Sequence, residues 1–410
     1  MPNNWKIYKV GEFAKLRKEG IKPSDFNGEK YIGLEHIGQG NFLLDGIGDA
    51  SDVTSNKSKF VKGDILYGKI RPYFKKVYRP KFSGICSTDM LVINSSNEKI
   101  VTQNYLHQII KNQEFTDKAT ETSTGTKMPR ADWNSLKLWE LNLPPLPEQK
   151  AIANILSAID DKIENNLAIN KTLEDMAMAL YKHWFVDFGP FQDGEFIDSE
   201  LGLIPKGWEV MPFLELFELL SGGTPKTSIE DYWNGNIYWV SAKDIGGSGS
   251  IYINDTEKKI TKLGIKKSAT KILPEDTVIV VARGSVGKFG MITKPMCMNQ
   301  SCYGIYSKSS YSQAITYLLI DSLMKHFLNV AYGSVFDTIT TSTFKSISVL
   351  LPPDNLMVKI GNEIDVLFRD KKTNIKENQT LTKLRDTLLP KLISGEVRLK
   401  EFQEEIENVM

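Results

Sequence analysis

Two long stretches of the chain carry apolar residues at alternating steps of three and four positions. In the first stretch these residues are Ile152, Leu156, Ile159, Ile163 and Leu173, and in the second they are Ile360, Ile364, Leu367, Leu381 and Leu388. This spacing is a heptad pattern, which predicts a single apolar stripe along a helix. We therefore predict two long helices, over residues 147–187 and 353–400, that pair through these residues.

The two predicted helices are copies of each other. Each follows a Leu-Pro-Pro sequence, Leu143–Pro145 or Leu351–Pro353, and their apolar residues match at an offset of about 208 positions. Four asparagines, Asn166, Asn170, Asn374 and Asn378, fall at or beside the predicted seam, where polar residues select register and orientation. The alternative is that they lie just outside it. Antiparallel pairing would relate the two copies by a pseudo-twofold axis.

A globular region precedes each helix, and the two regions share landmarks. They cover residues 1–146 and 208–352, joined through a linker at 188–207 that is rich in Gly, Pro and Asp. Each opens near a tryptophan, and each contains a short apolar strand followed by a basic, glycine-containing loop. The predicted fold is α+β: two α/β domains separated by two long antiparallel coiled-coil helices of about 55–60 Å, within a pseudo-twofold internal repeat.

Composition narrows the class of protein. The 410 residues are 41% hydrophobic and 25% charged, which is typical of globular proteins, and the formal net charge of +1 excludes a uniformly basic, nucleic-acid-coating chain. Three scattered cysteines favour neither a disulfide framework nor a zinc site. No apolar run reaches the roughly 20 residues of a membrane span, and the N-terminus lacks a secretory signal. We expect a cytoplasmic protein without membrane contact.

Catalytic signatures are missing from the sequence. It contains no P-loop, HExxH or GxSxG motif, and its four histidines stand singly without metal-ligand spacing. Neither a glycine-rich cofactor loop nor an Asn-Pro-Pro-aromatic motif for methylating a base is present. We therefore predict no catalytic residue and no metal site.

Basic and polar loops in both globular regions are the candidates for DNA contact. Arg and Lys neutralise phosphates, Arg pairs with guanine, and Asn or Gln pairs with adenine. Any one loop is also typical of ordinary solvated surface, but the recurrence of such loops in both copies favours DNA binding. The first region contributes Lys69, Arg71, Tyr73, Lys75, Lys76, Lys127 and Arg130; the second contributes Gly222, Gly223, Thr224, Lys226, Trp239, Lys243, Arg283, Ser285, Lys288, Asn299, Gln300 and Ser334.

Three phrases resemble the specificity subunits of type I restriction-modification systems. They are Leu143–Gln149 leading into Ile152–Leu156, Ser221–Pro225 before Tyr238–Val240, and Leu388–Arg398 near the end of the chain. The resemblance covers nearly the whole chain. The second copy departs from it, because Pro352-Pro353-Asp354-Asn355-Leu356 replaces the Pro-x-x-Glu-Gln phrase of the first.

The resemblance implies a non-catalytic DNA specificity subunit. Each target-recognition domain would read one half of a split target in double-stranded DNA, and the helices would set the spacer and dock the partners. Those partners would be two modification (methyltransferase) subunits and, in the full complex, two restriction subunits with endonuclease and translocase activity. S-adenosylmethionine, and ATP with magnesium, would be used by the complex and bound by the partners rather than by this chain.

Two other classes of function remain open on sequence alone. A self-sufficient methyltransferase or nuclease with a divergent site would show turnover without partners. A coiled-coil adaptor without a DNA role would agree with the near-zero net charge, and its assembled complex would show salt-insensitive DNA binding or none.

Overall fold

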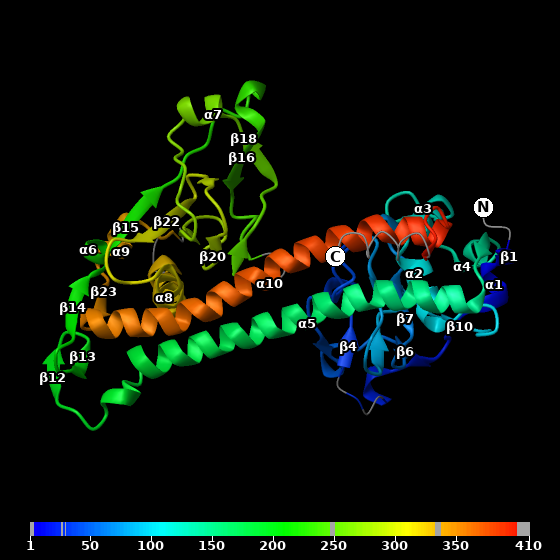
Figure 1. The fold of residues 1–410 in the computed structure, drawn as a ribbon, viewed down its shortest axis with the longest axis horizontal. Coiled ribbons are helices and arrows are strands. Elements are labelled where there is room, and N and C mark those ends of the chain that lie inside the picture. Colours follow the sequence, from blue (N-terminus) through cyan, green and yellow to red (C-terminus); the bar gives the residue numbers. More distant parts are fainter. Residues whose placement is uncertain (1–3, 26–27, 29, 247–250, 333–337, 400–410) are drawn as a thin grey trace. The chain divides into compact units, whose positions relative to one another are not determined.

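The computed structural model describes residues 4–25, 28, 30–246, 251–332 and 338–399 (Figure 1). The chain forms two compact units: the first unit comprises Met1–Asn166 with Glu377–Met410, and the second unit comprises Leu167–Lys376. The long helices α5 (Leu146–Phe185) and α10 (Asp354–Ser394) each contribute one half to each unit. Among the helices in the described ranges, none is both long and apolar enough to cross a membrane.

The first unit is built around a sheet of order β2-β10-β7-β8, beside a ribbon of β1 and β11 and a further sheet of order β3-β6-β9-β4-β5. Its strands are β1 (Lys6–Lys9), β2 (Ala14–Leu16), β3 (Gly20–Ile21), β4 (Lys30–Ile32), β5 (Gly48–Asp49), β6 (Lys57–Phe60), β7 (Ile65–Gly68), β8 (Val77–Tyr78), β9 (Gly84–Cys86), β10 (Met90–Ser95) and β11 (Glu140–Leu143). Its shorter helices are α1 (Val10–Phe13), α2 (Gln103–Lys111), α3 (Gln113–Glu121) and α4 (Trp133–Leu136).

The second unit is built around a sheet of order β15-β22-β19-β20-β17, with a β14–β23 ribbon, a β12–β13 hairpin and a sheet of order β18-β16-β21. Its strands are β12 (Phe196–Ser199), β13 (Gly202–Pro205), β14 (Glu209–Pro212), β15 (Phe217–Ser221), β16 (Trp233–Val240), β17 (Tyr252–Ile253), β18 (Lys258–Ile260), β19 (Val278–Val281), β20 (Phe289–Ile292), β21 (Cys297–Met298), β22 (Cys302–Ser307) and β23 (Ser348–Leu351). Its shorter helices are α6 (Phe213–Leu216), α7 (Lys262–Lys266), α8 (Gln313–Tyr332) and α9 (Thr341–Lys345).

The predicted internal repeat is present in the structure. Strands β2-β10-β7-β8 correspond in order and direction to β15-β22-β19-β20. One side-chain bridge is also repeated: Gln103 accepts from the backbone N–H of Ser95 (2.6 Å) and donates to the Gly63 carbonyl (2.8 Å). In the second unit Gln313 accepts from Ser307 (2.8 Å) and donates to the Asp276 carbonyl (2.9 Å). These bonds fix the residue correspondence between the copies.

Each unit has its core in the same three layers: sheet, short helix and long helix. In the first unit, Tyr105 and Ile109 of α2 are buried in one apolar cluster with Ile65 of the sheet and Leu156 of α5. In the second unit α8 packs beside β19 and β22 (Figure 1), and its Ile315 lies in one apolar cluster with Ile360 and Ile364 of α10. Burying a side chain of this size stabilises the fold by roughly 1.5–3 kcal/mol, so the long helices are integral parts of both cores.

The long helices pair in antiparallel fashion within each unit. In the first unit, Asn166 of α5 donates to Glu377 (2.7 Å) and Asn378 (2.9 Å) of α10. In the second unit, Asn374 of α10 donates to Asn170 of α5 (2.9 Å). Within the first unit Asp160 pairs with Arg385 and Asn166 with Asn378, and within the second unit Asn170 pairs with Asn374 and Glu174 with Lys371. In both units the residue numbers rise along one helix as they fall along the other, which defines the antiparallel direction. The asparagines therefore lie within the helix pair and not outside it.

The apolar residues of the predicted seam are divided between the two cores. Ile152, Leu156, Ile159, Ile163 and Leu388 are buried in the core of the first unit, where Leu381 is half-buried. Ile360 and Ile364 are buried in the core of the second unit, and Leu367 packs half-buried against it. Leu173 is half-buried in the second unit.

The departure in the second Pro-Pro phrase has a physical explanation. In the first copy the Gln149 side chain accepts from Thr102 N–H (3.1 Å) and donates to the carbonyls of Ile100 and Pro144 (2.7 and 3.0 Å). The residue at the corresponding place in α10 is Met357, which is fully buried in the apolar core of the second unit. The same helix start is thus fastened by hydrogen bonds in one copy and by apolar burial in the other.

Candidate nucleic-acid interface

Three loops meet at the C-terminal end of β7 in the first unit. The backbone N–H of Lys69 donates to the carbonyl of Asp89 (2.9 Å), and that of Ala131 donates to the carbonyl of Lys69 (2.9 Å). The N–H of Arg71 also donates to the Pro129 carbonyl (2.8 Å). The predicted DNA-contacting segments around Lys69–Lys76 and Lys127–Arg130 therefore form one cluster, although they lie more than 50 positions apart in sequence.

The second unit repeats this cluster at the end of β19. The N–H of Ala282 donates to the Ser301 carbonyl (2.8 Å), and the N–H of Ile339 donates to the Ala282 carbonyl (3.1 Å). These bonds correspond to the Lys69–Asp89 and Ala131–Lys69 bonds of the first unit. They bring the loop of Arg283, Ser285 and Lys288 beside Asn299 and Gln300, whereas the predicted Ser334 lies outside the described residues.

The first loop cluster presents cations outward at selected positions. Arg71 and Lys75 adopt left-handed backbone conformations (φ 49° and 51°) on either side of a short 3-10 helix that exposes 52% of Tyr73. Within the described part of the chain, the Arg71 guanidinium and the exposed Lys127 ammonium have no hydrogen-bond or ion-pair partner. These two groups are free to meet phosphate or base edges.

Other cations of this cluster already have partners. Lys69 donates to the Thr88 carbonyl (2.7 Å) and lies 3.9 Å from the Asp89 carboxylate, which also faces Arg130 at 4.0 Å. Lys76 donates to the Leu34 carbonyl (2.6 Å) and Lys75 to Gln113 (3.1 Å). Burial lowers the pKa of Lys75. These side chains hold the loops in shape, and Asp89 offsets part of their charge.

The glycines and tryptophan of the second unit support its loops from inside. Trp239 is 6% exposed, and its indole N–H donates to the Gly223 carbonyl (2.9 Å). A Cβ added to Gly222 would lie 1.9 Å from the Asn299 carbonyl oxygen, and one added to Gly223 would lie 2.4 Å from Thr270 N. Only glycine fits these close approaches.

This framework places polar groups at its surface. The Thr224 hydroxyl donates to the Gln300 side chain, which is exposed, as are Lys226 and Arg283. Lys243 is also exposed and lies 3.7 Å from Glu257. Both units therefore combine a shared backbone frame with different surface side chains.

Sequence reasoning missed a buried cluster beneath the first loop cluster. The ring of Phe42 has three cations near its face: Lys75 at 5.4 Å, Lys111 at 4.7 Å and Arg385 at 4.7 Å from the centroid. Arg385 also donates to the Asn41 carbonyl (3.3 Å). The repeat offers one signal for this cluster. Arg385 of α10 corresponds to Ala177 of α5, which is fully buried, so the position of Arg385 is one that the other copy buries.

The comparisons agree with the repeated architecture. The family model for the type I restriction modification DNA specificity domain matches residues 2–175 and 205–384. The chain is 25% identical to the Type I restriction enzyme HindI specificity subunit of Haemophilus influenzae, covering 96% of this chain and 100% of that protein. It is 29% identical to the MjaIX specificity subunit of Methanocaldococcus jannaschii, over 74% of this chain and 71% of that one.

A solved structure shares the fold. The type I restriction-modification S subunit from M. genitalium superposes with a TM-score of 0.61 at 16% identity, covering 96% of this chain and 97% of that chain. The family model spans both units and most of both long helices. This chain therefore belongs to the family of type I restriction-modification DNA specificity subunits.

Proposed function

We propose that each unit of this non-catalytic specificity subunit reads one half of a bipartite target in double-stranded DNA. The observation that carries the proposal is the duplicated loop cluster, built on the same backbone bonds around Lys69 and Ala282 but bearing different side chains. Identical frames with different surfaces suit two different half-sites. Arg71 and Lys127 would serve the first half-site, and Arg283 and Gln300 the second.

The long helices would connect the two units that read the half-sites. Each is continuous over about 40 residues, about 60 Å at 1.5 Å per residue, and each contributes to both cores. We propose that this pair sets the spacer between half-sites and docks two modification subunits, with two restriction subunits in the full complex. S-adenosylmethionine, ATP and magnesium would be bound by those partners, and the complex would act in the cytoplasm.

The proposal is tested by DNA binding of the chain assembled with its modification subunits. Arg71→Ala should weaken discrimination at one half-site by about 1–3 kcal/mol and leave the other unchanged, and Arg283→Ala should do the reverse. The matched control is Lys137→Ala, an exposed cation of the first unit away from the loop cluster. Equal effects of both arginine variants on both half-sites would contradict the proposal that each unit reads one half-site.

A further inference from the structure

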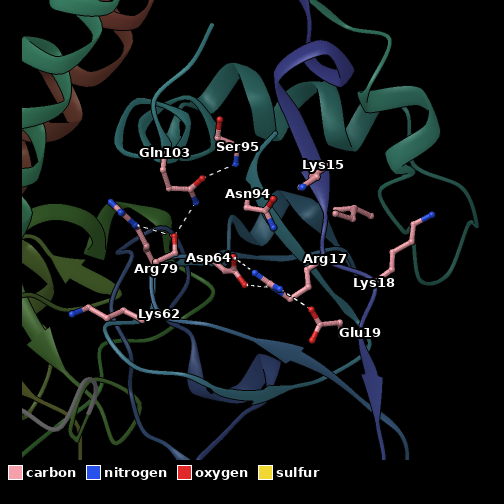
Figure 2. Close-up of a pocket in the computed structure, with 12 residues that line it drawn as sticks. Lys15, Arg17, Lys18, Glu19, Lys62, Asp64, Arg79, Asn94, Ser95 and Gln103 are labelled. Atoms are coloured by element: carbon pink, nitrogen blue, oxygen red, sulfur yellow. Dashed lines mark hydrogen bonds and ion pairs between the residues drawn. The ribbon is translucent and has the colours of Figure 1, made fainter. Parts of the chain in front are cut away.

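A cavity of about 580 Å³ lies in the first unit, away from the loop cluster (Figure 2). It is formed by the end of β2, the turn before β7, the end of β10 and the start of α2. Its lining includes the cations Lys15, Arg17, Lys18, Lys62 and Arg79. Among the described lining residues Glu19 and Asp64 are the only carboxylates, so the cavity carries a net positive charge.

The floor of the cavity is ordered by its own ion pairs. The Arg17 guanidinium lies 2.7 Å from both Asp64 Oδ2 and Glu19 Oε1, and the Asp64 side chain is only 4% exposed. Arg79 is held by the Gly63 carbonyl (3.2 Å) and Asn104 (2.8 Å). The carboxylates are thus already occupied by Arg17, as Figure 2 shows.

Three lysines of the rim remain available for a ligand. Lys15, Lys18 and Lys62 are exposed, and over the described ranges their ammonium groups have no hydrogen-bond or ion-pair partner. An anion entering the cavity would therefore meet free lysine ammonium groups. It would not have to break an existing ion pair, because the two carboxylates of the cavity are already paired with Arg17.

The second unit shows that the fold does not require this charge. The glutamine bridges and the strand registers assign a counterpart to each cation. The counterparts are Glu218 for Lys15, Leu220 for Arg17, Ser221 for Lys18, Glu275 for Lys62 and Met291 for Arg79. The same framework is thus basic in one copy and acidic, polar or apolar in the other. The basic cavity is a feature of the first unit and not of the repeat.

The chemistry of the lining indicates the kind of ligand. A protein partner is normally anchored by buried aromatic or apolar side chains, and Leu16 is the only large apolar residue in the described lining. Unpaired lysines without an apolar anchor instead suit the phosphates of a nucleic-acid backbone, which need cations and little else. An acidic protein segment is therefore the less favoured occupant.

The position of the cavity separates it from base reading. Lys62 lies before β7 and Lys69 after it, so the four residues of β7, about 13 Å, separate the cavity from the loop cluster. Successive phosphates of one strand advance about 3.4 Å along the duplex, so this separation corresponds to at most about four base pairs along the duplex axis. We propose that this cavity binds DNA backbone phosphates outside the base pairs read by the first unit, an inference that rests on the proposed DNA-reading function.

The test uses the chain assembled with its modification subunits and duplexes that carry the target. Single methylphosphonate linkages remove the charge of one phosphate at a time. In the native complex, a set of linkages outside the read base pairs should weaken binding. In the Lys15→Gln, Lys18→Gln, Lys62→Gln variant the same linkages should have no further effect, and the slope of log K against log salt should flatten by about 0.9 for each phosphate that is no longer neutralised.

Matched variants keep the test decisive. The control variant carries Lys6→Gln, Lys99→Gln and Lys137→Gln, which remove the same charge from exposed positions of the first unit outside the cavity. It should leave unchanged both the salt dependence of binding and the set of methylphosphonate linkages that weaken binding. Replacing the three cavity lysines by arginine should restore binding, and Lys62→Gln alone serves if the triple variant does not fold. An unchanged slope and pattern overturns the proposal, as does loss of assembly with unchanged DNA binding, which would indicate an acidic protein segment. Absence of target preference in the native complex would instead refute the DNA-reading function itself.

Discussion

Asp160 on α5 is the shared counter-ion of two buried cations, and removing its charge should destabilise the first unit. It forms ion pairs with Lys111 of α2 and with Arg385 of α10, at 3.4 Å from the latter. The Lys111 and Arg385 side chains are 0% and 2% exposed. Asp160→Asn preserves the size of the side chain but leaves Lys111 in the interior without its ion-pair partner.

The expected cost follows from this geometry. Removing one member of a buried ion pair typically costs about 3–5 kcal/mol. Arg385 retains the half-exposed Asp386 at 2.9 Å, so the lower end of this range, about 3 kcal/mol, is expected. For a unit of this size each kcal/mol lowers Tm by about 2–4 °C, so the midpoint should fall by about 6–12 °C.

The next residue in sequence provides the control. Asp161 pairs with Lys81, but the two side chains are 67% and 61% exposed, so Asp161→Asn should cost at most about 1 kcal/mol. Thermal and urea unfolding followed by tryptophan fluorescence would compare the two variants. Burial already lowers the pKa of Lys111, and loss of Asp160 should lower it further. The destabilisation should then shrink as the pH rises toward 10.5, the ordinary value for lysine. Equal stability of the two variants would refute the assignment of Asp160 as a buried counter-ion.

Three further predictions concern the glycine frame, a half-buried acid and the basic loop. Gly222→Ala should destabilise the second unit by several kcal/mol in urea unfolding, because the added Cβ would meet the Asn299 carbonyl. In the control Gly20→Ala, the added Cβ meets no atom within 4 Å, so stability should change by less than about 1 kcal/mol. Burial raises the pKa of Asp365, so ionisation of this carboxyl group opposes folding at neutral pH. Asp365→Asn should therefore raise the free energy of unfolding at pH 7, and this gain should disappear as the pH falls to 3.8, the ordinary value for aspartate. A gain that does not depend on pH would contradict this prediction. Replacing Lys69 and Arg71 together should flatten the salt dependence of DNA binding by about 0.9 for each phosphate left without a cation, with folding intact; an unchanged slope would remove both from the interface.

The long helices and the repeat could be predicted from sequence because a heptad pattern is local and the two copies keep register over many turns. The four asparagines were also interpretable, since a polar residue on an apolar stripe needs a polar partner, and the partner copy offers one. The two helices span Leu146–Phe185 and Asp354–Ser394 in the structure. The cut between the units passes through the helices rather than at their ends, because each half-helix is buried in a different core.

The details of the loop clusters could not be predicted in the same way. Lys75 and Lys76 were grouped with Arg71 by proximity in sequence, but both are half-buried and donate hydrogen bonds to Gln113 and Leu34, which are distant in the chain. Trp239 was grouped with DNA-contacting residues, and the structure buries it because its indole N–H finds the Gly223 carbonyl. Such placements depend on tertiary partners that no local pattern reveals.

The most direct test of the account is a methylation map. The chain would be co-expressed with its modification subunit, and methylated adenines would be located across the host DNA for the native chain and for a chain whose Lys69–Lys76 loop is exchanged for that of a relative. The account predicts a split motif in the native case and a change confined to one half of it after the exchange. A soluble, assembled complex that leaves no methylated motif, or an exchange that alters both halves together, would contradict it.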